Sequence, residues 1–441
     1  MRILIITYSF APAITPRAFR WAAIAEYWVK QGHNVDVICA WMPSRPRNEV
    51  YNGINVYRVG RVLTEIMQRH SPKTSVYLNN DINSKEIIST SLNQVKSSFL
   101  VTCVKWLHNN TWKKAYWPDY ACLWYFPALK KAKQLFLMNK YDGMVTISHP
   151  FTGHLIGLSV KKSYHQMPWL VDIGDPFSFL ENTPVNNNRL YNTLNYFYER
   201  KVLNGASTIS VTTDATLKRY AELFPESTIK IHVIPPLISS EESLLAEDFL
   251  FPIDEKIRLV FVGTLYKSIR NPDFLLQLYN KLLQTKVSEQ LELHFFGNIN
   301  DCQSCFEPYK KLYGKKIFLH GSVNRIKAIK AMKEADILIN IGNDTSYQLP
   351  SKVVEYVSTG KPILNIVKTN KDSSVAFFKS YPVIINILEN VTMLETERFD
   401  KLIDFIENSS HIEVSILKDW LDSFRIETIA ATYERILKCS N

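Results

Sequence analysis

Two cations stand in a loop where a phosphate could bind. Lys267 and Arg270 follow the apolar run 258–263, which ends at Gly263, and they precede a helix expected to begin near Pro272. An arginine can hold a diphosphate through a bidentate fork, and a lysine can hold it as a point charge. The alternative is that both are solvated loop cations. The spacing therefore indicates a candidate diphosphate site without deciding whether either side chain touches a ligand.

A second candidate anion site lies near the N-terminus. The loop after the apolar run 3–7 enters a helix with Thr15 as its N-cap and Pro16 at its first position. Free N–H groups and the positive end of the helix dipole favour an anion there, and Arg17 and Arg20 add charge. The loop contains no glycine, so it lacks a dinucleotide fingerprint. We predict that it binds an acceptor phosphate.

A short predicted helix carries a single acid. In SYQLPSKVVEYVSTGKPILNIV (346–367), Pro350 suits the first helical position and Gly360 the end. The valines fall on one side at helical spacing, whereas Ser351 and Glu355 share the opposite side. Glu355 is therefore predicted to point away from the core. A solvated surface acid is the alternative, because charged residues are mostly exposed.

Short apolar runs alternate with helical patterns along most of the chain, as in parallel sheets covered by helices on both faces. We predict an α/β fold with two doubly wound, Rossmann-like domains facing a cleft, with ligands beyond the carboxyl ends of the strands. The first domain is predicted at 1–240, with a helical insertion at about 63–140. The second domain is predicted at 251–415, and a C-terminal helix at 416–441. The apolar runs are 3–7, 35–41, 53–59, 143–148, 169–174, 207–212 and 230–235, then 258–263, 291–297, 316–321, 335–342, 362–367 and 382–387.

Composition narrows the class of protein. The chain has 441 residues, of which 46% are hydrophobic and 21% charged, which excludes disordered and fibrous classes. No segment offers about 18 uncharged apolar residues, so we expect a soluble or peripheral protein. The net charge of +10 favours an anionic partner. Six scattered cysteines indicate a reducing compartment, and the lone pair Cys302 and Cys305 is not assigned a function.

The insertion combines aromatic and basic residues. Tryptophans and lysines are interspersed in its sequence KWLHNNTWKKAYWPDYACLWYFPALKKAKQLF (105–136). This is the composition of a helix that lies on a membrane surface. A helical insertion that uses its aromatics as core is the alternative. Nucleic-acid binding is not expected, because no reader motif accompanies the charge.

Five motifs in this order and spacing make the chain similar to the family-four glycosyltransferases of GT-B architecture, which build bacterial surface polysaccharides. They are RAFRWAAIAEYWVKQGHNVDVI, VTISHPFTGHLIGL, WLVDIGDPFSF, VFVGTLYKSIRNPDFLL and LPSKVVEYVSTGKPIL. The resemblance covers nearly the whole length. It implies that residues 416–441 cross back to the first domain, and that the sugar is transferred with retention of anomeric configuration.

The resemblance also implies a donor site in the second domain. Glu355 would receive the ribose hydroxyls of a nucleotide-sugar, and the cations Lys267 and Arg270 would lie around its diphosphate. The base would pack near Gly321 and Val323. The other implied donor-site residues are Gly263, Gly297, Leu349, Pro350, Ser351 and Lys352.

The first domain would supply the catalytic and acceptor groups. His149 lies in the stretch where the family places a histidine that faces the ligand, and Asp175 follows a neighbouring strand, so both are candidate catalytic residues. Asp175 also precedes a proline, as an ordinary turn initiator does. The candidate acceptor-binding residues are Thr15, Arg17, Arg20, His154 and Asp172.

Two positions depart from the family pattern. The first acid of the family's paired-glutamate motif, eight residues before Glu355, is Tyr347 here, and a glycine-rich first loop is replaced by APAITP. The first change affects the contact to the donor sugar, and the second affects the shape of the acceptor pocket. Gln348 or backbone amides are possible substitutes.

We expect an enzyme that transfers a sugar from a nucleotide-sugar to a lipid-diphosphate-linked saccharide on the inner face of the plasma membrane. No cofactor is expected, and no metal, because neither domain shows an Asp-x-Asp at a strand end. A sugar-nucleotide epimerase on the same architecture is one alternative. A non-catalytic subunit that holds a partner transferase on the membrane is the other, and Tyr347 favours it.

Overall fold

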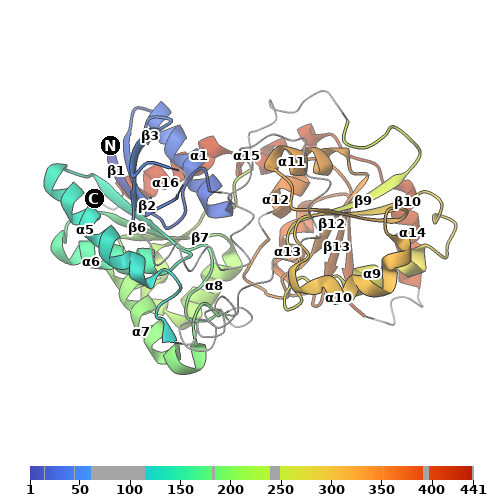
Figure 1. The fold of residues 1–441 in the computed structure, drawn as a ribbon, viewed down its shortest axis with the longest axis horizontal. Helices are drawn as coiled ribbons and strands as arrows, with labels where there is room; N and C mark the ends of the chain where they lie inside the picture. The colour runs from blue at the N-terminus through green and yellow to red at the C-terminus, as the bar shows by residue number, and fades with distance from the viewer. Residues whose placement is uncertain are drawn as a thin grey trace, which may run out of the picture. The chain divides into compact units, whose positions relative to one another are not determined.

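The computed structural model describes residues 1–13, 15–43, 45–60, 115–180, 184–238, 249–350, 352–390 and 397–439. Most of the predicted insertion and Ser351 lie outside these residues. The chain divides into two compact units. Unit 1 comprises Met1–Val211, Tyr220–Val233 and Ala430–Asn441, and unit 2 comprises Thr212–Arg219 and Ile234–Ile429. Each is built around its own sheet (Figure 1).

Unit 1 contains an eight-stranded sheet of order β3-β4-β2-β1-β5-β6-β7-β8. Every neighbouring pair is parallel except β3 with β4. The strands are β1 (Arg2–Ile6), β2 (Asn34–Ala40), β3 (Asn48–Tyr51), β4 (Ile54–Val59), β5 (Gly143–Ile147), β6 (Trp169–Asp172), β7 (Thr208–Val211) and β8 (Ile231–Val233). The described helices between residues 1 and 233 are α1 (Pro16–Lys30), η3 (Cys122–Trp124), α5 (Tyr125–Met138), α6 (Thr152–Ser163), α7 (Asn188–Gly205), α8 (Asp214–Leu223) and η4 (Pro225–Lys230).

The antiparallel edge strand β3 was not predicted. It pairs with β4 through a hairpin whose turn residues Asn52 and Gly53 have φ of 48° and 82°. Asn-Gly is the preferred sequence for a two-residue turn in which both central residues have positive φ. This dipeptide was the signal that could have revealed the hairpin.

Unit 2 contains a six-stranded parallel sheet of order β11-β10-β9-β12-β13-β14. Its strands are β9 (Ile257–Val262), β10 (Leu291–Phe296), β11 (Ile317–Gly321), β12 (Ile337–Ile341), β13 (Ile363–Val367) and β14 (Ile384–Leu388). Its helices are α9 (Asp273–Leu282), η6 (Asn300–Cys302), α10 (Gln303–Phe306), η7 (Glu307–Leu312), α11 (Arg325–Glu334), α12 (Lys352–Val357), α13 (Ser373–Phe377), η8 (Phe378–Ser380), α14 (Glu397–Asn408), η10 (Val414–Leu417) and α15 (Lys418–Asp422).

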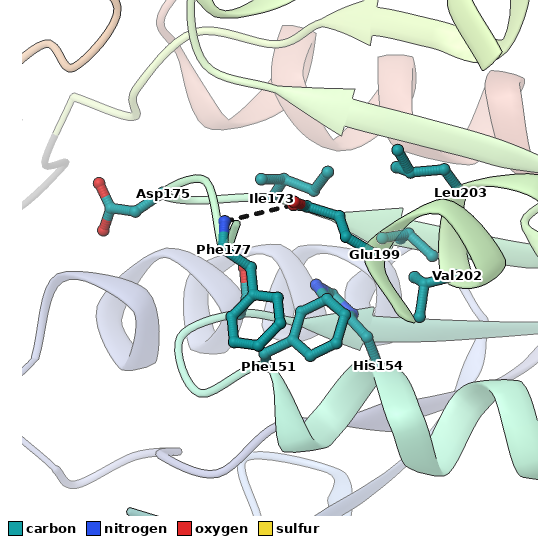
Figure 2. A pocket seen from close by; sticks show the side chains of 10 residues that line it. Phe151, His154, Ile173, Asp175, Phe177, Glu199, Val202 and Leu203 are labelled. Carbon is teal, nitrogen blue, oxygen red and sulfur yellow. Dashed lines mark hydrogen bonds between the residues drawn. The ribbon is translucent and has the colours of Figure 1, made fainter. Parts of the chain in front are cut away.

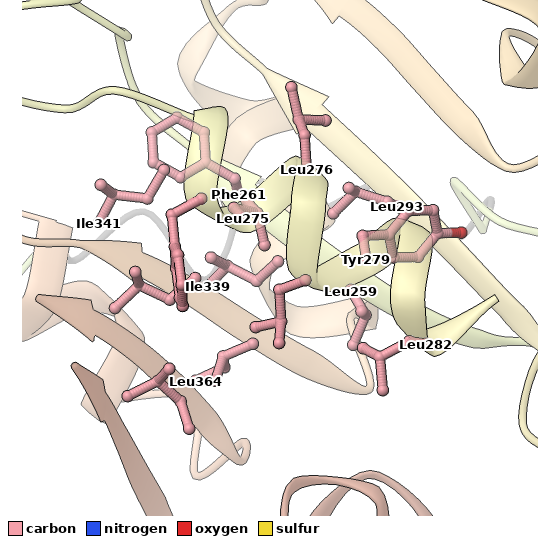
Figure 3. Packing of buried hydrophobic residues seen from close by; sticks show 14 of the residues in the cluster. Leu259, Phe261, Leu275, Leu276, Tyr279, Leu282, Leu293, Ile339, Ile341 and Leu364 are labelled. Carbon is pink, nitrogen blue, oxygen red and sulfur yellow. The ribbon is translucent and has the colours of Figure 1, made fainter. Parts of the chain in front are cut away.

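Side-chain alternation along β9 explains why unit 2 has apolar strands throughout. Leu259 and Phe261 join one buried cluster with side chains from α9 (Figure 3), and side chains from α14 belong to the same cluster. Val260 and Val262 join the cluster on the other face, with side chains from α11 and α12. Successive strand residues point to opposite faces, so a strand covered on both sides must be apolar at every position. The prediction of two doubly wound α/β domains is confirmed.

The C-terminal helix α16 (Ile426–Lys438) contributes its second half to unit 1. Trp28 of α1 donates its indole N–H to the carbonyl of Ala430 at 3.1 Å, and Tyr433 of α16 is completely buried. Leu437 packs so closely over β5 that a Cβ on Gly143 would lie 2.8 Å from its side chain. Residues 430–439 are therefore part of the core of unit 1.

Candidate functional site

Three glycines lie side by side at the carboxyl ends of β9, β10 and β11. The amide of Gly263 donates to the carbonyl of Phe296 at 2.9 Å, and the amide of Gly297 donates to the carbonyl of Gly321 at 2.7 Å. Gly297 has φ of 137°, and a Cβ there would lie 1.8 Å from the carbonyl oxygen of Gly263. Only glycine permits this close approach. The two backbones therefore meet at the edge where open parallel sheets bind ligands.

Arg270 is held at this edge by neighbouring loops. Its Nε donates to Oδ1 of Asn343 at 2.7 Å, and its Nη1 lies 3.4 Å from the carbonyl of Thr264. Asn343 is itself buried and donates to the carbonyl of Gln348 at 3.2 Å. Lys267 is exposed on the same loop, and its backbone amide donates to Asp301 at 3.0 Å. The guanidinium is therefore positioned in advance, whereas the ammonium extends into solvent.

Glu355 is less exposed than its place on the polar side of the helix suggested. Only 9% of the residue is accessible, because two cations cover its carboxylate. Nη2 of Arg325 lies 2.9 Å from Oε1, and Nζ of Lys352 contacts Oε2. Arg325 was not predicted from the sequence. Its only signal was a basic side chain two residues after Val323, in the loop expected to hold the base.

The helix that carries Glu355 is joined to the end of β9 through Tyr356. Tyr356 belongs to α12, and its hydroxyl accepts from the amide of Val262 at 2.9 Å and contacts the Val262 carbonyl at 3.3 Å. Burial raises the pKa of Tyr356, and the hydrogen bond from the amide of Val262 acts in the opposite direction. The helix of Glu355 is therefore anchored at the carboxyl end of β9, where Arg270 contacts the carbonyl of Thr264.

The remaining predicted donor residues surround the same helix. Val323 and Leu349 are partly buried and pack against the apolar cluster that contains the valines of α12. Pro350 is buried, and its carbonyl accepts from the amide of Val353 at 3.2 Å. Lys352 is the first residue of α12, which is only six residues long. The structure thus brings the described donor candidates of unit 2 to one edge of its sheet.

In unit 1, Asp172 at the end of β6 is the centre of a buried polar cluster. Its Oδ2 accepts from Nη1 of Arg17 at 3.1 Å and from the indole of Trp21 at 2.8 Å. Its Oδ1 accepts from Ser210 at 2.7 Å and from Tyr433 at 2.7 Å. Burial alone would raise the pKa of Asp172, but the nearby arginines and these hydrogen bonds lower it. The carboxylate is therefore ionised and fully paired in the folded protein.

The candidate acceptor residues of unit 1 differ in their access to solvent. Thr15 caps α1 as predicted, with its hydroxyl accepting from the amide of Ala18 at 3.2 Å. The guanidinium of Arg17 lies directly on Gly174, where a Cβ would come within 2.0 Å of it, and its side chain is 21% exposed. Arg20 is only 6% exposed and donates to the hydroxyl of Tyr433 at 3.0 Å. Of the two arginines, Arg17 is the one that reaches the surface.

Several buried polar atoms at the end of β5 lack a hydrogen-bond partner among the described residues. They are Oγ of Ser148, both ring nitrogens of His149, and Nε2 of His154. The other ring nitrogen of His154 lies 2.8 Å from the hydroxyl of Thr146. Burial lowers the pKa of His154 to about 3, so its ring is neutral at working pH. His149 and His154 thus present unused hydrogen-bonding groups at the same strand end.

Asp119 supports the loop that carries His149. Its carboxylate is buried and accepts from the amide of Thr152 at 2.9 Å, the hydroxyl of Thr152 at 2.7 Å and the amide of Ala121 at 2.9 Å. Burial raises the pKa of Asp119, and the hydrogen bonds from Thr152 and Ala121 act in the opposite direction. Asp119 was not predicted, because its role depends on a contact across 33 residues of sequence.

A small pocket beside these histidines is closed by aromatic rings. Phe151 and Phe177 stack at 3.8 Å, and the space behind them also touches His154 and Glu199 (Figure 2). Glu199 accepts from the amides of Phe177 and Ser178 at 3.2 Å and 2.9 Å. The carboxylate of Asp175 points away from this space (Figure 2). The carboxylate of Asp175 is therefore directed away from the side chain of His154.

The described part of the aromatic stretch uses its tryptophans for packing. Trp124 is 1% exposed. Trp117 packs against Tyr198 in a tilted arrangement, with ring centroids 4.7 Å apart, and donates to Asn195 at 3.0 Å. Tyr120 and Phe126 are exposed. The tryptophans at 106 and 112 lie outside the described residues. Within the described ranges, no helix has the length and apolarity to cross a bilayer, and no three His, Cys, Asp or Glu side chains are grouped to hold a metal ion.

Comparison with solved structures identifies the fold. The lipopolysaccharide outer core galactosyltransferase WaaB in its apo form is 11% identical, with a TM-score of 0.56 and full coverage of both chains. A glycosyltransferase from Rickettsia africae is 13% identical, with a TM-score of 0.58 over 100% of this chain and 98% of that one. The catalytic domain of starch synthase IV from Arabidopsis thaliana, bound to ADP and acarbose, is 8% identical, with a TM-score of 0.58 over 100% and 99%. No family model and no curated protein matches the sequence. These likenesses show that the chain has the GT-B fold.

Proposed function

We propose that this protein is a glycosyltransferase that moves a sugar from a nucleotide-sugar donor to a hydroxyl of an acceptor. The observation that carries the proposal is that Arg270 and the helix of Glu355 are both held at the carboxyl end of β9: Arg270 contacts the carbonyl of Thr264, and Tyr356, next to Glu355, bonds the amide of Val262. In these positions the carboxylate can bind the ribose and the guanidinium can bind the diphosphate of one nucleoside diphosphate. The likeness to solved glycosyltransferases supports the same function.

In this proposal the donor is held by unit 2. Glu355 accepts hydrogen bonds from the ribose hydroxyls, since a charged acceptor makes the stronger bonds. Arg270 and Lys267 bind the diphosphate and stabilise its charge as the glycosidic bond breaks, because preorganised cations act where charge develops. The close backbones at Gly263 and Gly297 let the diphosphate approach the strand ends, and Val323 packs near the base.

Unit 1 supplies the acceptor side of the proposal. Arg17 binds a phosphate of the acceptor, and the buried groups Asp172 and Arg20 hold that guanidinium and its helix in place. His149 and Asp175 are the proposed catalytic residues, one bonding a sugar hydroxyl and the other taking the acceptor proton. The acceptor is proposed to be a lipid-diphosphate-linked saccharide of a surface polysaccharide. Transfer is proposed to retain the anomeric configuration and to need no divalent cation.

An isothermal titration with ADP, GDP, UDP and CDP tests the donor site. We expect at least one of them to bind the wild-type protein. Glu355→Ala and Arg270→Ala should each weaken that binding by roughly 1 to 3 kcal/mol, the range for a hydrogen bond to a charged group and its unpaired partner.

Two exposed residues of unit 2 serve as matched controls. Glu255→Ala and Lys311→Ala remove the same kinds of charge from sites that are exposed. Both should bind the nucleotide as the wild-type protein does. If Glu355→Ala and Arg270→Ala also retain full affinity, the donor site is not where we propose.

Helix α7 supports a membrane partner. Leu190, Leu194 and Phe197 are 64%, 36% and 49% exposed, and their spacing of four and three residues puts them on one face. Nζ of Lys201, one turn further, lies 4.2 Å above the ring of Phe197. The only acid of α7, Glu199, is buried. An apolar stripe next to cations suits the surface of an anionic bilayer.

We predict that the triple variant Leu190→Ser, Leu194→Ser, Phe197→Ser binds phosphatidylglycerol-containing vesicles about tenfold more weakly than the wild type. Partial insertion of three apolar side chains is worth at least this much. Co-sedimentation measures the effect. The control is Val50→Ser with Ile253→Ser, which removes two highly exposed apolar side chains outside α7, one from each unit. Equal vesicle binding by the triple variant and the control would contradict a membrane role for α7.

A further inference from the structure

Arg325 is fixed beside the carboxylate assigned to the donor ribose. It is the first residue of α11, directly after the N-cap Asn324, whose side chain accepts from the amide of Lys327 at 2.8 Å. Its Nη2 lies 2.9 Å from Oε1 of Glu355, and the two side chains are 21% and 11% exposed. The helix start and the ion pair together hold the guanidinium at one place.

Both carboxylate oxygens of Glu355 have a cationic partner, and the partners come from different elements. Oε1 is held by Arg325 of α11, and Oε2 is held by Lys352 of its own helix. A carboxylate offers roughly four lone-pair sites, so two remain after these contacts. These two sites, one on each oxygen, match the two hydroxyls of a vicinal diol.

Without Arg325, the orientation of this carboxylate would no longer be fixed from both sides. Lys352 reaches Glu355 from three residues earlier on the same helix, so it constrains only one oxygen. On another side Glu355 borders a shallow pocket lined by Ile329 and Met332 of α11 and by Ser358. Rotation toward that pocket or toward Lys352 would turn Oε1 away from the ligand.

We infer that Arg325 is a specificity-determining positioning residue: by holding Oε1 of Glu355 it presents the carboxylate to a ribose diol and makes the site prefer ribonucleotides to 2′-deoxyribonucleotides. This inference rests on the proposed function of Glu355 in donor binding. The preference arises because a preorganised acceptor loses less on binding than one that must first be ordered. A ligand lacking the 2′-hydroxyl leaves one of the two presented sites unused.

The test compares each nucleoside diphosphate that binds with its 2′-deoxy counterpart, by titration calorimetry on the full-length protein. In Arg325→Met the preference for the ribonucleotide should fall by about fivefold or more, as for the loss of one hydrogen bond to a charged acceptor. Affinity for the 2′-deoxy ligand should change by less than about twofold. Lys327→Met, which removes a cation from the exposed side of the same helix, should keep the wild-type preference.

Two further variants separate positioning from a merely structural role. Arg325→Lys keeps the charge and should restore part of the preference. Glu355→Gln should lower the preference as much as Arg325→Met does, and the double variant should lower it no further, because both act on one carboxylate. If circular dichroism shows that Arg325→Met is unfolded, Arg325→Lys replaces it in the comparison with the wild type, because lysine lacks the planar fork of arginine.

The possible outcomes distinguish this inference from the proposed function. A wild-type preference in folded Arg325→Met, together with a lowered preference in Glu355→Gln, overturns the role of Arg325 and leaves the donor site intact. Failure of every nucleoside diphosphate to bind the wild-type protein overturns the proposed function itself, and the inference with it.

Discussion

Replacing Asp172 with alanine is expected to destabilise the protein by about 3 to 5 kcal/mol, the cost of breaking a buried charged network from one side. Four donors meet this carboxylate: Arg17, Trp21, Ser210 and Tyr433. They come from α1, β7 and α16, so the change removes the group that joins three elements. Urea unfolding followed by tryptophan fluorescence measures the loss.

Ser210→Ala is the graded control for this prediction. It removes one neutral donor and should cost about 1 kcal/mol, the usual net value of a single hydrogen bond. Because Asp172 is 1% exposed, no solvent can replace the lost contacts in the folded state. A stability of Asp172→Ala within about 1 kcal/mol of the wild type would show that the cluster is not a source of stability.

The pH dependence of the same comparison follows from the lowered pKa of Asp172. A carboxyl whose folded pKa lies below its unfolded value stabilises the protein above the unfolded value, near 4, and loses that contribution as pH falls through the folded value. The difference between wild type and Asp172→Ala should therefore be constant at neutral pH and shrink in acid below about pH 4.

His154 adds a separate acid effect that both proteins share. Burial lowers its pKa from 6.5 to about 3. The unfolded chain therefore binds more protons than the folded chain between these values, and stability falls as pH falls through that window. This loss begins near pH 6, above the window of Asp172, and the two windows overlap only below about pH 4.

Sequence reasoning found those features of the site that depend on local patterns. Apolar runs predicted both sheets, because strands buried on two faces are apolar at every position. Thr15 was recognised as a cap from its place before Pro16, and the structure shows the expected hydrogen bond. Arg270 was placed in the loop between β9 and α9 because a strand ending in glycine, a short loop and a helix start follow one another directly in the chain.

Features that depend on contacts between distant segments were missed or only partly described. The pairing of Arg325 with Glu355 spans 30 residues, and the bond between Arg20 and Tyr433 spans 413. The sequence placed Arg20 at a helix start, but the packing of α16 over α1 is what buries it. Periodicity placed Glu355 on the polar side of its helix, and it could not show that two cations cover that side.

Gly297→Ala is expected to cost at least about 4 kcal/mol of stability, a size reached only through a specific clash or strain. The new Cβ would lie 1.8 Å from the carbonyl oxygen of Gly263, and the φ of 137° is one that side chains rarely adopt. Neither contact atom is the end of a flexible side chain, so relief requires the end of β9 to move away from β10. That movement would carry the loop of Lys267 and Arg270 with it, because the loop begins at Gly263.

Gly314→Ala separates strain from clash in this prediction. Gly314 has φ of 69°, but nothing lies within 4 Å of its ideal Cβ position. Gly314→Ala should therefore lose only about 1 to 2 kcal/mol of stability, the cost of a left-handed backbone conformation. Urea midpoints of the two variants measure the excess due to the clash, and calorimetry with the bound nucleoside diphosphate measures the effect on the site. Equal stabilities would mean that β9 and β10 tolerate separation at this edge, and the close approach of their backbones would then not be what shapes the loop of Arg270.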